Sequence, residues 1–368
     1  LWEHRHVVTH HAAAPAILLL LLVGAFTKSA QFPFHFWLPG AMEAPTPVSA
    51  YLHAATMVKA GIYLLGRLYP AFGEMTLWLA LVGTIGVVTM CIGGFMAILS
   101  KDLKQLLAYS TVSQLGLLTA YYGFGYGRLI PGPGEDPHLL KADLLLVASH
   151  AFFKGALFML VGIIDHGCHT REWPRLGGLM KAMPRTAVLT ILASMSMAGV
   201  PLTLGYTAKE LFIEAGLYVK SYDVLLFESL VWVAIAASTF TVAYSLRMAV
   251  SPFFGKLRDD HIHPHEAGWG MLAAPAVLVG LCVAGGVYLP LIETPVSWLV
   301  NREFIADTAA FKLTEKKVLI SAFLFLVGGP LVFLASGRIE ALYNGLGSPR
   351  PFAQFYEAIF LRFVPWLA

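Results

Sequence analysis

The sequence predicts an all-α polytopic membrane protein, and three observations support that prediction. Of its 368 residues, 57% are hydrophobic and only 13% are charged, which is too apolar for a soluble domain of this size. Several separate apolar segments are long enough to cross ~30 Å of hydrocarbon at ~1.5 Å per helical residue. Strand-like alternation is absent over ten-residue blocks, so we expect helices rather than a barrel to span the bilayer.

Nine apolar spans follow one another along the chain. The polar segments between them are short, and none is long enough for an independent soluble domain. The chain opens with "LWEHRHVVTHH" and shows neither an initiator Met nor a signal-peptide pattern, which predicts that it is incomplete at its N-terminus. The expected spans are 12–27, 47–65, 76–99, 103–125, 142–164, 186–219, 224–250, 269–290 and 316–336.

Two of these spans are interrupted in the same way. The first runs into "TKSAQFPFHFWLP", and the sixth is too long for one crossing and contains "GVPLTLGYTAKE" at 199–210. Unpaired backbone is tolerated in a bilayer only where protein or a wet cavity surrounds it, and paired interruptions mark the inverted repeats of transporters. Five crossings separate Lys28 from Lys209, and an odd number inverts the second copy. We therefore expect two broken helices in oppositely oriented repeats.

The fifth span carries two ionisable residues near its middle, in "ASHAFFKGALFML". His150 and Lys154 are four residues apart, so they share one helix face about 6 Å apart along the axis. A Lys at the centre of a bilayer costs roughly 3 kcal/mol, and apolar residues on both sides make snorkelling to the surface difficult. A desolvated Lys readily exchanges a proton, so Lys154 is predicted to carry protons rather than to form a purely structural ion pair.

His53 and Lys59 lie in "YLHAATMVKAG" on the second span. Six residues correspond to about 240° around a continuous helix, so we expect partners on different helices. A neutral imidazole both donates and accepts, which makes His53 a candidate relay between Lys28 and His150. The alternative is a core histidine bonded to a carbonyl.

Lys28 and Lys209 each lie beside a break, where a helix end offers carbonyls and access to water, so both are predicted to lie in the ion path. Glu210 is a possible accessory residue, as a counter-charge or an exit; the alternative is a glutamate at the membrane interface. In "SKDLKQLLAYSTVSQLG", Ser100 is expected to cap an incoming helix, and Lys104 is expected to be part of its solvated start.

The sequence contains no pattern typical of nucleic-acid binding, of a cofactor site or of a metal site. The net charge of +3 is scattered, so there is no basic face for nucleic acid. No nucleotide, flavin or iron–sulfur motif is present, and the histidines of "HRHVVTHH" and "HIHPHE" are expected in wet loops rather than metal sites. We predict no catalytic residues, no metal and no cofactor. The spans contain almost no carboxylate near their centres, so the sequence does not locate a site for a transported cation.

Long strings of the sequence resemble a known family. "KSAQFPFHFWLPGAMEAPTPVSAYLHAATMVKAG", "SKDLKQLLAYSTVSQLG" and "SHAFFKGALFMLVGIIDH" are similar to the antiporter-like subunits shared by Mrp-type multisubunit Na⁺/H⁺ antiporters and respiratory complex I. The likeness covers about 24–215, and "GIIDH" followed by "TREWPRLGGL" resembles the A subunit of the Mrp antiporters in particular.

The resemblance implies two inverted five-helix repeats, each with a broken helix, and a hydrated chain of charged residues across the membrane midplane. On that pattern Lys28 and Lys209 are the lysines of the two broken helices, His53 is the relay histidine and Lys154 is the central lysine. Relatives pair the first lysine with a glutamate on an earlier helix, which this chain does not contain. Many also carry a second histidine where Leu146 stands, so the relay here is expected to use water or Ser149.

The resemblance also implies an organisation and partners. Residues 1–220 are expected to form the antiporter-like core, and 221–368 to add transmembrane helices and a C-terminal membrane-associated segment. The expected function is that of a secondary transporter subunit, in a hetero-oligomeric complex of a bacterial cell membrane, that moves H⁺ against Na⁺. Two alternatives stay open: a proton-translocating subunit of a complex I-related redox enzyme, and the membrane subunit of an inorganic-carbon uptake complex. A purely structural scaffold is opposed by the number of buried lysines.

Overall fold

A computed structural model describes residues 9–124, 138–218, 225–300 and 315–334 of the chain. In these ranges the regular structure is helical, and the strand-type pairing is a single bridge between Asp102 and Glu172. The predicted all-α class is therefore confirmed for the part that the structure describes. The N-terminal residues 1–8, which include His4 and His6, lie outside the described residues, as do 125–137, 219–224, 301–314 and 335–368.

The helices follow the predicted spans closely. Five are long and apolar enough to cross a membrane: Thr46–Phe72 counted through a break, Thr76–Leu99, Leu140–Cys168, Ser229–Val250 and Trp269–Val287. The elements in chain order are α2 Ala14–Lys28, η1 Phe34–Phe36, α3 Trp37–Gly40, η2 Ala41–Glu43, α4 Thr46–Ala54, α5 Met57–Phe72, α6 Thr76–Trp78, η3 Leu79–Gly83, α7 Thr84–Leu99, α8 Leu103–Phe124, α9 His138–Cys168, α10 Pro184–Ala198, α11 Leu204–Tyr218, α12 Leu225–Val250, α13 Trp269–Val287, α14 Pro290–Val300 and α15 Glu315–Leu334.

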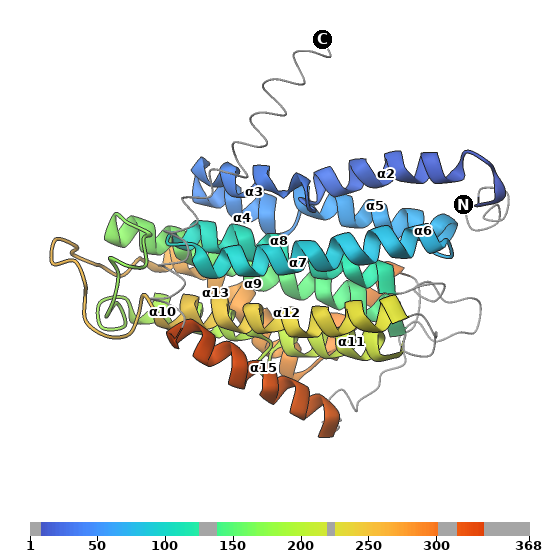
Figure 1. Ribbon diagram of the computed structural model, residues 1–368. Helices are drawn as coiled ribbons and strands as arrows, with labels where there is room; N and C mark the ends of the chain where they lie inside the picture. Colours follow the sequence, from blue (N-terminus) through green and yellow to red (C-terminus); the bar gives the residue numbers. More distant parts are fainter. Residues whose placement is uncertain (1–8, 125–137, 219–224, 301–314, 335–368) are drawn as a thin grey trace, which may run out of the picture.

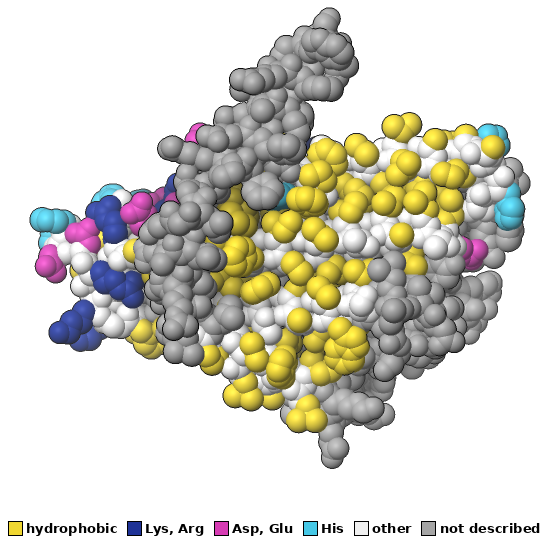
Figure 2. Space-filling model, in the orientation of Figure 1, with side chains coloured by type: hydrophobic (Ala, Val, Ile, Leu, Met, Phe, Trp, Pro, Cys, Tyr) yellow, Lys and Arg dark blue, Asp and Glu magenta, His cyan; other side chains and the backbone are white. Residues whose placement is uncertain are grey.

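The long helices lie side by side in one bundle, with α8 and α9 in its interior (Figure 1). The closest pair is α7 and α8, because small residues let their backbones approach: a Cβ at Gly86 or Gly116 would overlap the backbone of the facing helix. The space-filling view shows apolar side chains over the middle of the molecule, whereas most of the charged side chains gather at one end and histidines lie at both ends (Figure 2). An apolar belt with polar ends is what a bilayer requires.

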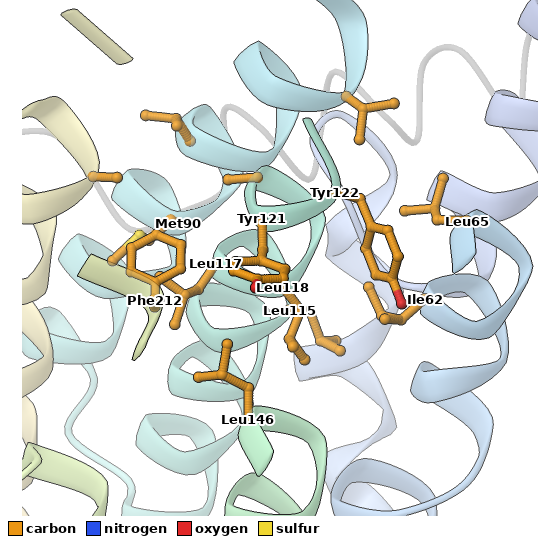
Figure 3. Packing of buried hydrophobic residues seen from close by; sticks show 14 of the residues in the cluster. Ile62, Leu65, Met90, Leu115, Leu117, Leu118, Tyr121, Tyr122, Leu146 and Phe212 are labelled. Carbon is orange, nitrogen blue, oxygen red and sulfur yellow. The ribbon is translucent and has the colours of Figure 1, made fainter. Parts of the chain in front are cut away.

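The core consists of two clusters of buried apolar side chains. One lies between α5, α7, the second half of α8 and α11; Figure 3 shows Tyr122 reaching from α8 toward Ile62 of α5, and Tyr121 with Phe212 of α11 on the other side. The other joins α9, α10, α12 and α13 around Leu157, Met197 and Tyr244. Between the two clusters α9 is packed on several sides, so its polar residues face protein rather than lipid.

The first predicted break is confirmed at the end of α2. The helix ends at Lys28, and the chain turns through Ala30, which has a positive φ of 51°. Two interactions hold the turn: the Phe32 N–H donates to Thr89 Oγ1 on α7 (2.8 Å), and Trp37 Nε1–H donates to the Thr27 carbonyl (3.0 Å). The backbone freed by the break is thus bonded to protein.

The second predicted break, between α10 and α11, is confirmed as well. Gly199 follows α10 in the left-handed conformation, with a φ of 80°. Its N–H donates to the Met195 and Ser196 carbonyls and so caps the C-terminus of the helix. In Figure 1, α2 runs toward α3 in the direction opposite to that of α10 toward α11. The broken helices are therefore antiparallel, as inverted repeats require.

A third interruption was not predicted. The second span is not one helix, because α4 ends at Ala54 and α5 begins at Met57. Thr56 Oγ1 donates to the Tyr51 carbonyl (3.0 Å), a local bond that competes with helix propagation. The angle of about 240° between His53 and Lys59 assumed a continuous helix and does not apply.

Candidate ion path

A polar stripe runs along α9. Asp143, His150 and Lys154 occupy positions i, i+7 and i+11, so they lie within about 40° of one another around the helix and extend over ~16 Å of its axis. All three are buried; the exposed fractions of Asp143 and Lys154 are 4% and 0%. The predicted His150–Lys154 pair therefore lies inside the protein, with a carboxylate on the same face.

Lys154 binds neutral oxygens on α8. Its Nζ donates to Ser110 Oγ and to the Leu107 carbonyl (3.2 Å). Neither acceptor carries a charge, so these contacts solvate the ammonium without neutralising it. Such a site can hold either the charged or the neutral amine, as a group that loads and releases protons requires.

The two histidines lie on neighbouring helices, His53 on α4 and His150 on α9. His53, near the end of α4, stacks on Phe158 of α9 with ring centroids 5.3 Å apart, and its two ring nitrogens find no hydrogen-bond partner among the described residues. His150 lies beside Ala54, the last residue of α4, and within electrostatic reach of His53. Ser149, next to His150, is buried.

Lys59 completes this group from α5. It is 7% exposed, and its Nζ has no hydrogen-bond partner in the described part of the chain. Its charge acts on Asp143, His150 and Lys154 of α9. The break between α4 and α5 thus lets His53 pack on α9 while Lys59 lies within electrostatic reach of the same helix.

Lys209 occupies the second break. Its Nζ donates to the carbonyls of Met197 (2.8 Å) and Ala198 (2.9 Å), the last residues of α10. These carbonyls are the negative end of a helix, which favours a cation. A Cβ on Gly199 would lie 2.8 Å from Lys209 Cδ, so a glycine is needed here for space as well as for its positive φ.

A cavity of about 30 Å³ lies beside Lys209. Glu210, 9% exposed, lines it together with Tyr206 of α11, Ser238 of α12 and Ser321 of α15. The lining is mostly apolar, but its polar groups can hold a water molecule in a cavity of this size. Glu210 is therefore not at an open interface in this chain.

Lys28 is not brought together with the other predicted residues. It ends α2 at the first break, as expected, but its side chain is exposed, whereas Ser29 and Ala30 beside it are buried. The site therefore contains His53, Lys59, His150 and Lys154 as one group, Lys209 at the second break, and Lys28 on the outside of the bundle.

Lys104 was missed by sequence reasoning, which expected a solvated helix start. It is 1% exposed, and its Nζ donates to the Ala44 carbonyl after η2. The cap of α8 is Asp102 rather than Ser100, since Asp102 Oδ1 accepts the backbone N–H groups of Lys104 (2.7 Å) and Gln105 (3.1 Å). The available signal was the apolar stripe of the helix, to which Lys104 belongs with Ala108 and Leu115.

Asp143 was missed as well, and its spacing of seven residues to His150 could have indicated it. Together the buried residues form a series of titratable side chains at the centre of an apolar bundle, with neutral acceptors and open hydrogen-bonding atoms. Ionisable groups at such positions are expensive and typically line ion or proton pathways.

Comparisons with known proteins show the family to which the sequence is similar. The family described as NADH:quinone oxidoreductase/Mrp antiporter, TM, matches residues 5–236, more than half of the chain. The A subunit of the Na(+)/H(+) antiporter of Alkalihalophilus pseudofirmus is 46% identical over 296 residues, which are 78% of this chain and 37% of that protein. The A/B subunit of a probable K(+)/H(+) antiporter of Rhizobium meliloti is 45% identical over 282 residues, 76% of this chain and 27% of that protein.

The fold is similar to that of a solved assembly. A chain in the structure of the Mrp complex from Dietzia sp. DQ12-45-1b superposes with a TM-score of 0.77 at 35% identity, covering 93% of this chain and 36% of that one. The chain thus spans about a quarter to little more than a third of the length of these relatives. The matched family, the multi-pass helical fold and the two broken helices agree, and the chain belongs to the NADH:quinone oxidoreductase/Mrp antiporter transmembrane family.

Proposed function

We propose that this chain is part of the A subunit of an Mrp-type multisubunit cation/H⁺ antiporter in a bacterial cell membrane. It acts as a secondary transporter subunit rather than as an enzyme, and it works with the other subunits of a hetero-oligomeric complex. The observation that carries the proposal is Lys154, an ammonium at the centre of the bundle whose hydrogen bonds in the described ranges go to neutral oxygens.

The proposed path runs through buried lysines and histidines, with Glu210 and Ser149 as accessory groups. Lys28 belongs to it as the lysine of the first broken helix, and Lys209 as that of the second. Residues 1–220 form the antiporter-like core that holds the path, and 221–368 add helices around it. The proposed proton carriers are Lys28, His53, Lys59, His150, Lys154 and Lys209.

Charge repulsion supplies the coupling. Two unit charges about 6 Å apart in a medium of effective dielectric constant ~20 repel by about 3 kcal/mol, roughly a hundredfold in a protonation equilibrium. A proton that arrives on Lys59 therefore favours release from Lys154, and the charge moves along α9. The same repulsion, acting on a cation that crosses in the opposite direction, links H⁺ entry to cation export.

The exported cation is Na⁺ in this proposal. The relative from Alkalihalophilus pseudofirmus is named for a Na(+)/H(+) antiporter, whereas that from Rhizobium meliloti is named for a probable K(+)/H(+) antiporter. Exchange is therefore measured with each cation separately.

The direct test is Lys154→Ala in the complete complex. Everted membrane vesicles are energised, and the cation-dependent collapse of the pH gradient is followed by fluorescence. We expect assembly at normal levels and at least a tenfold loss of exchange, because the central proton carrier is gone. Lys181→Ala, at an exposed lysine, is the matched control and keeps normal exchange. Normal exchange by an assembled Lys154→Ala complex would refute the proposal.

A second candidate function follows from the description of the family, which includes NADH:quinone oxidoreductase. In a redox enzyme the same buried series would move protons driven by electron transfer. Purification of the native complex separates the two: iron–sulfur subunits that co-purify at stoichiometric amounts favour the redox enzyme, and small membrane subunits without redox centres favour the antiporter.

A further inference from the structure

A buried carboxylate, Asp143, lies at one end of the polar stripe on α9. Its Oδ2 accepts a hydrogen bond from the Tyr122 hydroxyl of α8 (2.7 Å). Its Oδ1 is buried and has no hydrogen-bond partner in the described ranges. One oxygen is thus fixed by α8 while the other stays open, although a buried carboxylate is normally fully bonded.

The opposite charge within electrostatic reach of Asp143 is that of Lys59. The Asp143 carboxylate is the opposite charge that acts on Lys59, whose Nζ is itself buried and unbonded within the described residues. An acid and an amine therefore lie within electrostatic reach of each other, each with an unused hydrogen-bonding atom.

The face of α5 that carries Lys59 also packs against Tyr122, the residue that binds Asp143. A Cβ on Gly66 would lie 2.8 Å from the Tyr122 hydroxyl, so this glycine makes room for the group that holds Asp143. Gly66 is seven residues after Lys59 and therefore lies within about 20° of it around α5. Figure 3 shows the hydroxyl end of Tyr122 beside Ile62, between these two positions on the helix.

A nearby carboxylate shows the opposite arrangement. Glu293 of α14 forms a buried ion pair with Lys141 of α9, with Oε1 and Nζ 2.5 Å apart. That carboxylate has a direct cationic partner in contact with it. Asp143, two residues along α9, is held on one side only, so its protonation state is free to follow the charge on Lys59.

We propose that Asp143 is a further proton-carrying residue, which exchanges a proton with Lys59 and connects the α9 stripe to the membrane face where α9 begins. In the step, the Lys59 ammonium loses a proton and becomes a neutral amine while the Asp143 carboxylate gains it and becomes a carboxylic acid. The total charge of the pair is zero before and after the step. The Tyr122 hydroxyl keeps the acid in place in both states. This inference rests on the proposed antiport function.

The test uses the complete complex with Asp143→Asn, Asp143→Glu and Glu293→Gln, and exchange is measured between pH 6 and pH 9. Asp143→Asn is expected to assemble and to lose exchange at least tenfold, because an amide cannot carry the proton. Asp143→Glu restores most of the rate with a shifted pH profile, which a merely structural residue would not do. Glu293→Gln, the matched loss of a buried carboxylate, keeps the pH profile of the parent.

The outcomes separate this inference from the proposed function. If Lys154→Ala abolishes exchange and Asp143→Asn keeps the rate and pH profile of the parent, only the role of Asp143 is overturned. If Lys154→Ala itself exchanges normally, the antiport function fails. If Asp143→Asn changes only the Na⁺ concentration for half-maximal exchange, Asp143 is a cation ligand rather than a proton carrier, and the proposal is overturned.

If the Asp143→Asn complex does not assemble, Tyr122→Phe tests the proposal instead. This variant keeps the carboxylate and is expected to shift the pH profile of exchange. An unshifted profile contradicts the proposal.

Discussion

Cations at the polar end of the molecule are held differently from the lysines at the centre of the bundle. At the end, Arg171 binds Asp102, and Arg175 Nη2 and Nε donate to Asp259 Oδ2 at 2.6 and 2.9 Å. In the bundle, Lys154 and Lys209 bind hydroxyl and carbonyl oxygens instead. The two arginines thus have carboxylates in contact, whereas the two interior lysines are held by dipoles.

The difference separates two uses of charge. Exposed ion pairs contribute little to stability because water screens them, and here they join loops that are far apart in the sequence. They are accompanied by Trp173, whose Nε1–H donates to the Ser100 carbonyl (2.8 Å) while Arg247 lies over its ring at 4.8 Å. Interior lysines held by neutral oxygens are costly to bury, so a functional reason for them is required.

The largest effect is expected at Lys209, a lysine inside the bundle that is held by neutral oxygens. Lys209→Ala removes the only cation that the described residues place on the Met197 and Ala198 carbonyls, and exchange in everted vesicles is expected to fall at least tenfold. Lys256→Ala, at the exposed end, is the matched control and keeps the parental rate. If both variants exchange alike, the distinction between interior and end lysines fails.

A smaller effect is expected from the backbone that supports Lys209. Gly199→Ala places a Cβ at a φ of 80° and 2.8 Å from Lys209 Cδ, which costs about 1–2 kcal/mol and displaces the lysine. We expect a lower thermal transition of the purified complex and a partial loss of exchange. Gly24→Ala is the control in the other broken helix, because a Cβ there meets nothing within 4 Å. An unchanged transition for Gly199→Ala would argue against strain at the break.

The smallest effect is expected at the polar end. Hydrogen bonds from the Arg175 guanidinium hold the pKa of the Asp259 carboxyl below its ordinary value. A depressed pKa means that the stabilisation is present above the ordinary carboxyl pKa of about 4 and is lost as pH falls below it. Arg175→Ala should therefore speed cleavage of the 251–268 loop by trypsin at pH 7 without changing exchange.

The pH dependence is checked with pepsin, which cleaves in acid. The parent loop is expected to become more susceptible as pH falls below about 4, and the difference between parent and Arg175→Ala to disappear there. A loss of exchange in Arg175→Ala would show that the polar end takes part in transport and would remove the contrast with the interior.

Much of the fold could be predicted from local patterns. Apolar runs marked the spans, and prolines or glycines beside Lys28 and Lys209 marked both breaks, because Pro removes a backbone donor and Gly permits a positive φ. The stripe of His150 and Lys154 followed from helical periodicity alone. The break between α4 and α5 was missed, since no Pro or Gly lies at Ala55 or Thr56 and the interruption depends on a side-chain bond from Thr56.

By itself, the sequence determined the membrane-spanning helical class, the two broken helices and the helix face that carries the central lysine. The tertiary structure alone decided which groups meet. Lys104 binds the Ala44 carbonyl, 60 residues earlier, and Asp143 lies within electrostatic reach of Lys59 because α5 and α9 both pack on α8. The reason is physical: periodicity fixes the direction of a side chain on its own helix, whereas burial and partners depend on what another helix places opposite.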